Sequence, residues 1–324
     1  MPSNRLNNVT YIRIFATLMV VAYHSLCLYT SRWSYTDVPK INLYEHFAEL
    51  LNRIDMPAFV FISGYLFSRQ ISSNKFNKSI EIIWYKVNRL IIPYLFWMII
   101  NLILVPESLT LTKILNGFNH LWFLPMLLQL FLVAVITIPL WTNLSKQASL
   151  LCFASMQLFF FVAYYKGWNI PFGYIKTFFP VFYLGIISEK CHLLNIKQHW
   201  HNYILPISCT IYAFSCIYLF TDNPAVRDII IKITAYTIIF SSMSLLTTAK
   251  YITHPAITCI DKYSMGIYLI HHILIQYSLS LHPIFLFLAT HYIIGPILIF
   301  TASTICSIYM ASLLHKTPYL QKVI

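Results

Sequence analysis

The sequence predicts an all-α protein, a polytopic membrane bundle of about ten transmembrane helices with both termini in the cytoplasm. Composition supports this prediction, because 58% of the residues are hydrophobic, only 10% are charged and the mean hydropathy is +0.67. A soluble globular protein has about 25% charged residues. The connections between apolar segments are short, so we expect residues 1–324 to form a single integral membrane domain.

Apolar windows of about 20 residues, long enough to cross a bilayer as helices, mark ten predicted spans. No short apolar core with a small-residue cleavage site opens the chain, so we expect the first span to be retained. Gly295 and Pro296 are expected to bend the last span. In chain order the spans are 10–30, 43–68, 81–105, 120–141, 148–165, 172–188, 202–220, 228–248, 260–279 and 284–312.

The distribution of basic residues predicts the orientation of the bundle. With a cytoplasmic N-terminus, the inner segments hold thirteen Lys and Arg residues, the outer loops hold five, and four lie within spans. This bias agrees with the positive-inside rule and with an even number of spans. The inner residues are Arg5, Arg69, Lys75, Lys78, Lys86, Arg89, Lys146, Lys190, Lys197, Lys250, Lys262, Lys316 and Lys322, and the outer residues are Arg32, Lys40, Lys113, Lys166 and Arg227.

Charge and cysteine content argue against several other classes. The net charge of +12 follows mostly from the topology, and the basic residues lack the interleaved exposed aromatic residues of a strand-binding surface. We therefore expect no nucleic acid partner. Seven cysteines form no C-x-x-C pair and most lie in apolar runs, so we expect neither a disulfide framework nor a metal site.

Two ionisable residues, Arg13 and His24, stand inside the first apolar span. A charge at that depth costs a few kcal/mol and usually marks a functional path. Eleven residues at roughly 100° each make three turns and about 20°, so both side chains project from one helix face, about 16 Å apart along the axis. This separation suits a long ligand whose anionic end is held at Arg13 while chemistry takes place at His24.

A second basic group is expected at the cytoplasmic face. Arg69 ends the second span, and Lys86 and Arg89, three residues apart, are neighbours on the third. Together with Arg13 they can form a pocket for a polyanion, because guanidinium and ammonium groups pair well with phosphate. Ordinary anchoring at the headgroups is the alternative, and it is the interpretation that we prefer for Lys75 and Lys78.

Several motifs resemble those of the acyltransferase-3 family of integral membrane acyltransferases. Arg13 with His24 is followed, in the family's order, by FVFISGYLF, by Lys86 and Arg89 ahead of LIIPYLFW, by HLWFLPML, by FYLGIISEK and by DKYSMGIYLIHH. These motifs extend over residues 13–272. Lys86 departs from the pattern, in which arginine is common, and an ammonium group cannot form a bidentate fork with phosphate.

The resemblance implies a membrane O-acyltransferase with a ten-helix core. Such a protein transfers an acyl group, commonly acetyl from cytoplasmic acetyl-coenzyme A, to a hydroxyl of a cell-surface or lipid-linked carbohydrate. Its expected partners are the acyl-CoA donor, the carbohydrate acceptor and membrane lipids. The resemblance also implies a multi-pass protein of a cell membrane, and we expect the inner or plasma membrane of a bacterium.

Histidine suits the general base, because its ordinary pKa lies near neutrality, and His24 is our candidate for that role. Arg13, Arg69, Lys86 and Arg89 are the candidates for binding coenzyme A phosphates. Direct transfer and an acyl-imidazole relay through His24 both stay open. The alternative for a lone membrane histidine is a hydrogen-bonded residue of the core.

The remaining candidates belong to the other spans. His120 is expected to contact the acceptor, with Trp122 offering an apolar face to a sugar ring, although an interfacial aromatic belt explains Trp122 equally. His271 and Tyr268 share one face of the ninth span. His271 is a further catalytic candidate that supports the site, Tyr268 is expected to contact the acceptor, and His272 is interpreted as packing.

Glu45, Glu49 and Arg53 follow one another at steps of four, so they can pair along one stripe of a helix. A structural ion pair is one interpretation of this stripe. The other is a polar cleft for the acceptor, in which Glu49 or Asp55 orients a hydroxyl or a histidine.

Two other functions remain open from the sequence. A transporter or exporter of polysaccharide precursors or small solutes also has about ten helices with polar residues at mid-depth, although the two halves show no clear repeat. A haem protein with His24 and His271 as axial ligands is a third interpretation, and nothing else in the sequence supports it.

Overall fold

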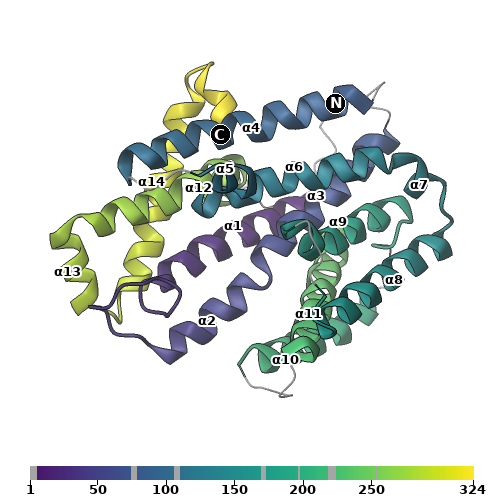
Figure 1. Cartoon of the computed structure of the whole chain (residues 1–324), viewed down its shortest axis with the longest axis horizontal. Helices are drawn as coiled ribbons and strands as arrows, with labels where there is room; N and C mark the ends of the chain where they lie inside the picture. Colours follow the sequence, from purple (N-terminus) through teal and green to yellow (C-terminus); the bar gives the residue numbers. More distant parts are fainter. Residues whose placement is uncertain are drawn as a thin grey trace. The chain divides into compact units, whose positions relative to one another are not determined.

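The structure is a computed structural model, and it confirms the all-α class (Figure 1). It describes residues 6–73, 79–105, 110–168, 173–195, 198–217, 224–250, 252 and 254–324, and these residues contain no β-strand. Arg5, Lys75, Lys78 and Lys197 of the predicted inner set lie outside the described residues.

The chain divides into two compact units, each assembled from three segments. The first unit comprises Met1–Ile12, Met56–Asn88 and Pro125–Tyr251, and the second comprises Arg13–Asp55, Arg89–Leu124 and Ile252–Ile324. The helices α1 (Asn7–Cys27) and α4 (Ser79–Leu104) each contribute residues to both units.

The first unit contains most of the helices from the middle of the chain. Its helices α3 and α9 approach closely through two glycines: a Cβ atom on Gly64 would lie 2.0 Å from the carbonyl oxygen of Phe182, and one on Gly185 would lie 2.2 Å from that of Phe61. Small residues allow such close backbone contact in membrane helices. The helices of this unit are α3 (Asp55–Ser72), α6 (Phe123–Ile136), α7 (Ile138–Asn143), α8 (Lys146–Tyr165), α9 (Tyr174–Lys190), α10 (Gln198–Ile217), α11 (Pro224–Leu245) and the 3₁₀ turn Leu246–Thr248.

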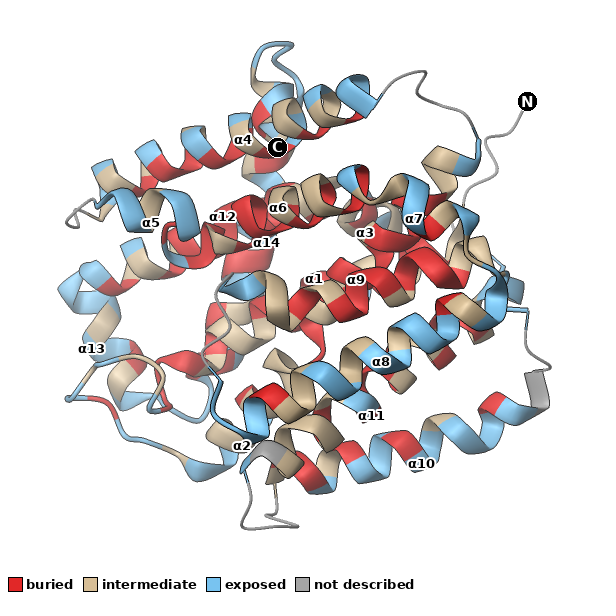
Figure 2. Cartoon of the chain, turned by 45° about the vertical axis from the view of Figure 1, so that its right-hand side comes forward, coloured by how far each residue is buried: buried red, intermediate tan, exposed pale blue. Residues whose placement is uncertain are grey.

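The second unit combines most of α1 with the C-terminal helices. Besides parts of α1 and α4 it contains α2 (Asn42–Asn52), α5 (Leu111–Asn116), the 3₁₀ turn Asn119–Trp122, α12 (Pro255–Ser280), α13 (His282–Thr290), α14 (Gly295–His315) and the 3₁₀ turn Leu320–Val323. Buried residues are concentrated along α1 and α12 in Figure 2. These two helices carry four of the candidate site residues, Arg13, His24, Tyr268 and His271.

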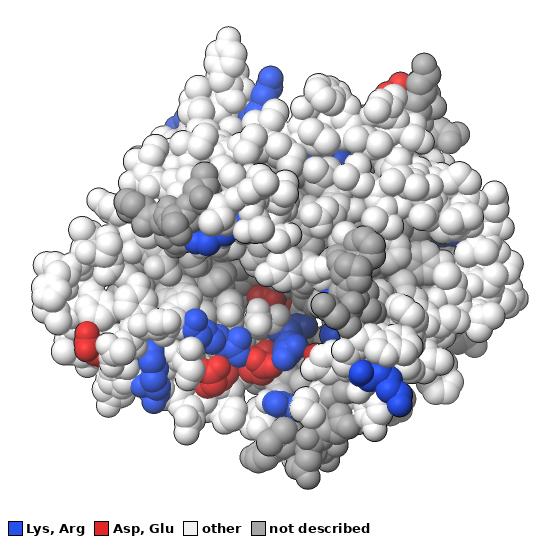
Figure 3. All heavy atoms as spheres, viewed as in Figure 1, with Lys and Arg blue, Asp and Glu red and all other residues white. Residues whose placement is uncertain are grey.

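Among the described residues, six helices are long and apolar enough to cross a membrane, or seven if the bent pair α12 and α13 counts as one span. The protein is therefore a multi-pass membrane protein, while the count of ten spans and the cytoplasmic termini stay predictions. Much of the face in Figure 3 is uncharged, and many of its Lys, Arg, Asp and Glu side chains gather in a band across its lower half. The six helices are Asn7–Cys27, Ser79–Leu104, Asn119–Ile136, Lys146–Tyr165, Val226–Thr248 and Gly295–His315.

Three predicted spans are interrupted in the structure. The span 43–68 breaks between α2 and α3, 120–141 breaks between α6 and α7, and 284–312 breaks between α13 and α14. Pro296 occupies the first turn of α14, where its missing N–H has no cost, so a helix begins there where the sequence predicted a bend. The sharp bend of 95° lies instead between α12 and α13.

The close contact of α3 with α9 predicts the effect of one added methyl group. Gly64→Ala places a Cβ against a backbone carbonyl that cannot rotate away, so we expect a loss of at least about 2 kcal/mol of stability. Thermal unfolding of the purified protein measures it, with Ser63→Ala on the same helix as the control. Equal melting temperatures for both variants would contradict this packing.

Candidate active site

Two polar contacts join α1 to α12 within the second unit. The guanidinium of Arg13 donates to Asp261 through Nε, at 3.1 Å from Oδ1, and through Nη2, while Nδ1 of His24 lies 3.0 Å from Nε2 of His271. The two residues on α1 are eleven apart and their partners on α12 are ten apart, so the helices run parallel. The two contacts, about 16 Å apart along α1, fix the register of one helix against the other.

Hydrogen bonds along α12 assign the proton positions of this histidine pair. The Nδ1 of His271 lies 2.8 Å from the carbonyl oxygen of Ile267, which can only accept, so Nδ1 carries the proton and donates. The Nε2 of neutral His271 is then an acceptor, and His24 donates to it through Nδ1. The lone pair of His24 is therefore on Nε2, the atom that can take a proton from a substrate.

A third histidine, His120, is held in the same unit by a tight turn. Gly117 adopts φ +106° and its backbone lies so close to Trp122 that a side chain there would collide with the Cα atom of Trp122. The Nε2 of His120 donates to the carbonyl of Leu269 at 3.1 Å, and the Tyr268 hydroxyl donates to the carbonyl of His120 at 2.5 Å. Among the described residues the buried Nδ1 of His120 has no hydrogen-bond partner.

Two residues that the sequence analysis did not assign to the site complete the cluster. The ring of His272 lies 4.8 Å from that of His24 and is stacked on His120 at 4.4 Å, and its buried Nδ1 has no partner within the described part of the chain. Trp33 follows α1, with its ring 6.3 Å from His24 and 5.7 Å from His272. His272 was visible as the second residue of a His-His pair, whereas nothing in the sequence singled out Trp33.

The predicted donor-binding residues fall in both units, so their assembly into one pocket stays a prediction. Arg13 is partly exposed and Arg89 is exposed, both in the second unit. Arg69 and Lys86 belong to the first unit. Lys86 is buried there, with its Nζ 3.2 Å from Oε1 of Gln70 and 4.0 Å from the centre of the Phe131 ring.

The structure shows the surroundings of each residue that was predicted to bind the acceptor. Trp122 is partly buried beside Phe123, and Asp55 is buried at the first residue of α3. Tyr268 is buried and bonded to His120, as described above. Their roles in binding an acceptor stay predictions.

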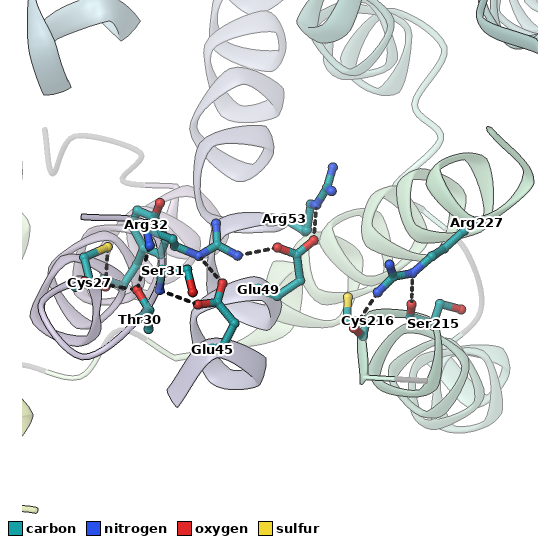
Figure 4. A network of polar contacts seen from close by, with 11 residues as sticks. Cys27, Thr30, Ser31, Arg32, Glu45, Glu49, Arg53, Ser215, Cys216 and Arg227 are labelled. Atoms are coloured by element: carbon teal, nitrogen blue, oxygen red, sulfur yellow. Dashed lines mark hydrogen bonds and ion pairs between the residues drawn. The ribbon is translucent and has the colours of Figure 1, made fainter. Parts of the chain in front are cut away.

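Glu49 belongs to a network of ion pairs that confirms the predicted pairing with Arg53, at 2.8 Å (Figure 4). Its second carboxylate oxygen accepts from Arg32 at 2.5 Å, and Glu45 accepts from both Arg32 and the backbone of Ser31. Burial raises the pKa of Glu49, but the ion pairs with Arg53 and Arg32 outweigh burial and leave this pKa below its ordinary value. The network thus fixes the turn that carries Trp33.

Metal coordination has no support in the described residues, where no group of three or more His, Cys, Asp or Glu side chains is arranged to hold a metal ion. The four histidines instead contact one another through their rings, and one hydrogen bond joins His24 to His271. The arrangement presents the partly buried imidazole of His24, which has a defined lone pair and lies among three further imidazoles.

Comparison with known families decides the class of chemistry. A family model described as an acyltransferase domain matches residues 6–316, nearly the entire chain. The chain belongs to this acyltransferase-3 family. Searches of curated proteins and of solved structures returned no match. With its membrane-spanning helices, the protein is a membrane acyltransferase.

The Arg13–Asp261 ion pair of this acyltransferase predicts a strong energetic coupling between α1 and α12. In a double-mutant cycle of Arg13→Ala and Asp261→Ala, we expect a coupling energy of about 0.5–3 kcal/mol, because the contact joins two helices and the carboxylate of Asp261 is buried. Equilibrium unfolding of the four proteins in mixed micelles measures it. Additive effects would show that the pair does not hold the register.

The proton assignment predicts different results for two substitutions of His271. His271→Leu removes the acceptor for Nδ1 of His24, so we expect kcat to fall on the order of 100-fold with little change in KM for the acyl donor. His271→Gln keeps an oxygen acceptor and should lose less.

The control for this comparison is His291→Leu, on an exposed histidine of the same unit. Size-exclusion profiles identify any variant that fails to fold. A wild-type kcat in both His271 variants would show that His271 contributes only to packing.

Proposed function

We propose that this membrane acyltransferase transfers an acetyl group from cytoplasmic acetyl-coenzyme A to a hydroxyl of a lipid-linked or cell-surface carbohydrate. The observation that carries the proposal is the defined lone pair on Nε2 of His24, in a histidine cluster within a family of acyltransferases. An unprotonated imidazole beside an apolar bundle is suited to remove a proton from a weakly acidic hydroxyl.

In the proposed reaction, Nε2 of His24 takes the proton of the acceptor hydroxyl. The hydroxyl oxygen bonds to the carbonyl carbon of the thioester, the C–S bond breaks, and the imidazolium returns its proton to the sulfur of coenzyme A. His271 supports the imidazolium as it forms, because its Nε2 accepts the hydrogen bond from Nδ1 of His24 in both charge states.

The thioester oxygen gains negative charge during this step and needs a hydrogen-bond donor. His272 is the candidate, because its buried Nδ1 has no partner in the described residues and its ring lies 4.8 Å from that of His24. Arg13 is the candidate for the phosphate end of the donor, three turns of α1 away from His24.

Replacement of the proposed base tests the function directly. His24→Ala in liposomes should release coenzyme A from acetyl-coenzyme A at 100-fold to 10,000-fold lower rate, roughly the contribution of a general base. A thiol assay measures release, and His282→Ala, an exposed histidine of α13, is the control. A folded His24→Ala protein with the wild-type rate would contradict the assignment.

A further inference from the structure

The second unit contains a long stretch of chain without a Lys, Arg, Asp or Glu residue. This stretch runs from Lys262 to Lys316 and forms most of α12, all of α13 and all of α14. The segment 281–294, which links α12 to α14, is therefore as uncharged as the two long helices. Connections that lie in water are usually rich in charged or small polar residues. The composition of this link thus favours a position in or against lipid.

The helix within this link, α13, lies across the direction of the bundle. It follows α12 after one residue and is bent from it by 95° (Figure 1). Because α12 runs parallel to α1, which is long and apolar enough to cross a membrane, α13 runs nearly perpendicular to the crossing direction. Its nine residues are about 13 Å long, less than half of a hydrocarbon core of about 30 Å. α13 therefore does not cross a bilayer.

Tyr29 places α13 at one end of the bundle. It follows the last residue of α1 by two positions, and its hydroxyl donates to the carbonyl of Leu288 in α13 at 3.1 Å. The same hydroxyl lies directly against the backbone of Gly295, the first residue of α14. At the other end of α14, the rings of Tyr263 and His315 are 6.0 Å apart. α14 therefore leads from the end of the bundle that carries α13 to the end where α12 begins.

Large apolar side chains of α13 are exposed at this end of the bundle. Ile284, Leu286 and Phe287 are between 40% and 49% exposed, and Ile293 and Ile294 continue the apolar surface toward α14. Exposed apolar surface of this kind is unfavourable in water and favourable against acyl chains. The surface adjoins α14, a helix that is itself long and apolar enough to cross a membrane, so lipid is present at its side.

Backbone carbonyl groups at the end of α13 are paired within the chain. The hydroxyl of Thr290 donates to the carbonyls of Leu286 and Phe287, at 2.9 and 3.0 Å. The hydroxyl of Tyr44, from α2, donates to the carbonyls of residues 292–293, at 3.2 and 3.3 Å. The last carbonyls of a helix have no partner within the helix and need one wherever water is scarce. The link is thus built to lie in an environment with little water.

The length of α12 between its ion pair and α13 matches the thickness of a bilayer. Asp261, the partner of Arg13, precedes the end of α12 at Ser280 by 19 residues, about 28 Å. The hydrocarbon core is about 30 Å thick, and an ion pair at its boundary costs less than one in its interior. His271 follows Asp261 by about 15 Å and precedes Ser280 by about 13 Å, so it lies midway between the ion pair and α13.

We propose that α13 lies flat in one interface of the membrane and binds phospholipid at the boundary between headgroups and acyl chains. Short helices with exposed apolar side chains are held at this boundary by burial of those side chains. The level of α13 then marks one surface of the hydrocarbon core, and the histidine cluster lies near the middle of the bilayer. The inference does not depend on the proposed acyl transfer, and it sets the depth at which any reaction at His24 takes place.

Depth-dependent fluorescence quenching tests the inference. A fluorescent amino acid, introduced by stop-codon suppression, replaces Ile284, Leu286 or Phe287 in otherwise wild-type protein, so an unfolded variant at one position leaves two others. Phosphatidylcholine liposomes carry nitroxides either at the headgroup or deep in the acyl chain. We expect the headgroup nitroxide to quench all three positions more strongly than the deep nitroxide. The three depths should agree within about 5 Å and lie roughly 15 Å from the bilayer centre.

The matched control is Ile305, an exposed residue at the middle of α14, where the deep nitroxide should quench most strongly. Three results would overturn the inference. The first is an equal depth for Ile305 and the positions of α13. The second is quenching of α13 by aqueous iodide and by neither nitroxide, which would place the helix in water. The third is protection of α13 from every quencher together with cross-linking of a photoreactive residue at position 287 to a second copy of the chain.

Discussion

The hydrogen bond between His24 and His271 is the contact on which the rest of the candidate site depends. It forms only in one register of α1 against α12, and the Arg13–Asp261 ion pair three turns away holds that register. In a low-dielectric bundle an unpaired buried polar group is costly, so each contact favours the other. Together the two contacts fix α1 against α12 and leave Nε2 of His24 as the proposed reactive atom.

The same constraint explains why the histidines differ from one another. Both ring nitrogens of His271 form hydrogen bonds, one with the carbonyl of Ile267 and one with His24, so the orientation of its ring is fixed. His120 uses one nitrogen, on the carbonyl of Leu269, and keeps a buried atom without a partner in the described residues. Buried polar atoms are rarely left unpaired unless a ligand or a reaction needs them. In the proposed mechanism, the unpaired nitrogens of His120 and His272 are therefore the atoms of the cluster that remain available to a substrate.

Spacing along a helix was sufficient to predict the parts of the site that lie on one element. The eleven-residue step from Arg13 to His24 and the four-residue step from Glu49 to Arg53 depend only on helical geometry, and the structure agrees with both. Asp261, His272 and Trp33 could not be predicted in the same way, because their contacts depend on how distant segments pack. The break near residue 291 was missed because a largely apolar composition continues across it, whereas Asn52, Arg53 and Asp55 interrupt the apolar run at the break near residue 53.

In the proposed mechanism, Arg13 binds the phosphate end of the donor and also helps to hold the helix that carries His24. Two of its five N–H donors are directed at Asp261, so a phosphate that binds the guanidinium shares it with that carboxylate. In the proposed mechanism, binding of the donor would change the strength of the ion pair that holds α1 in register. Because the His24–His271 hydrogen bond depends on the same register, occupancy at one end of α1 would then be coupled to the position of the proposed base at the other. An ion pair with a buried carboxylate contributes little net stability, and in the proposed mechanism such coupling would be a physical reason for placing one here.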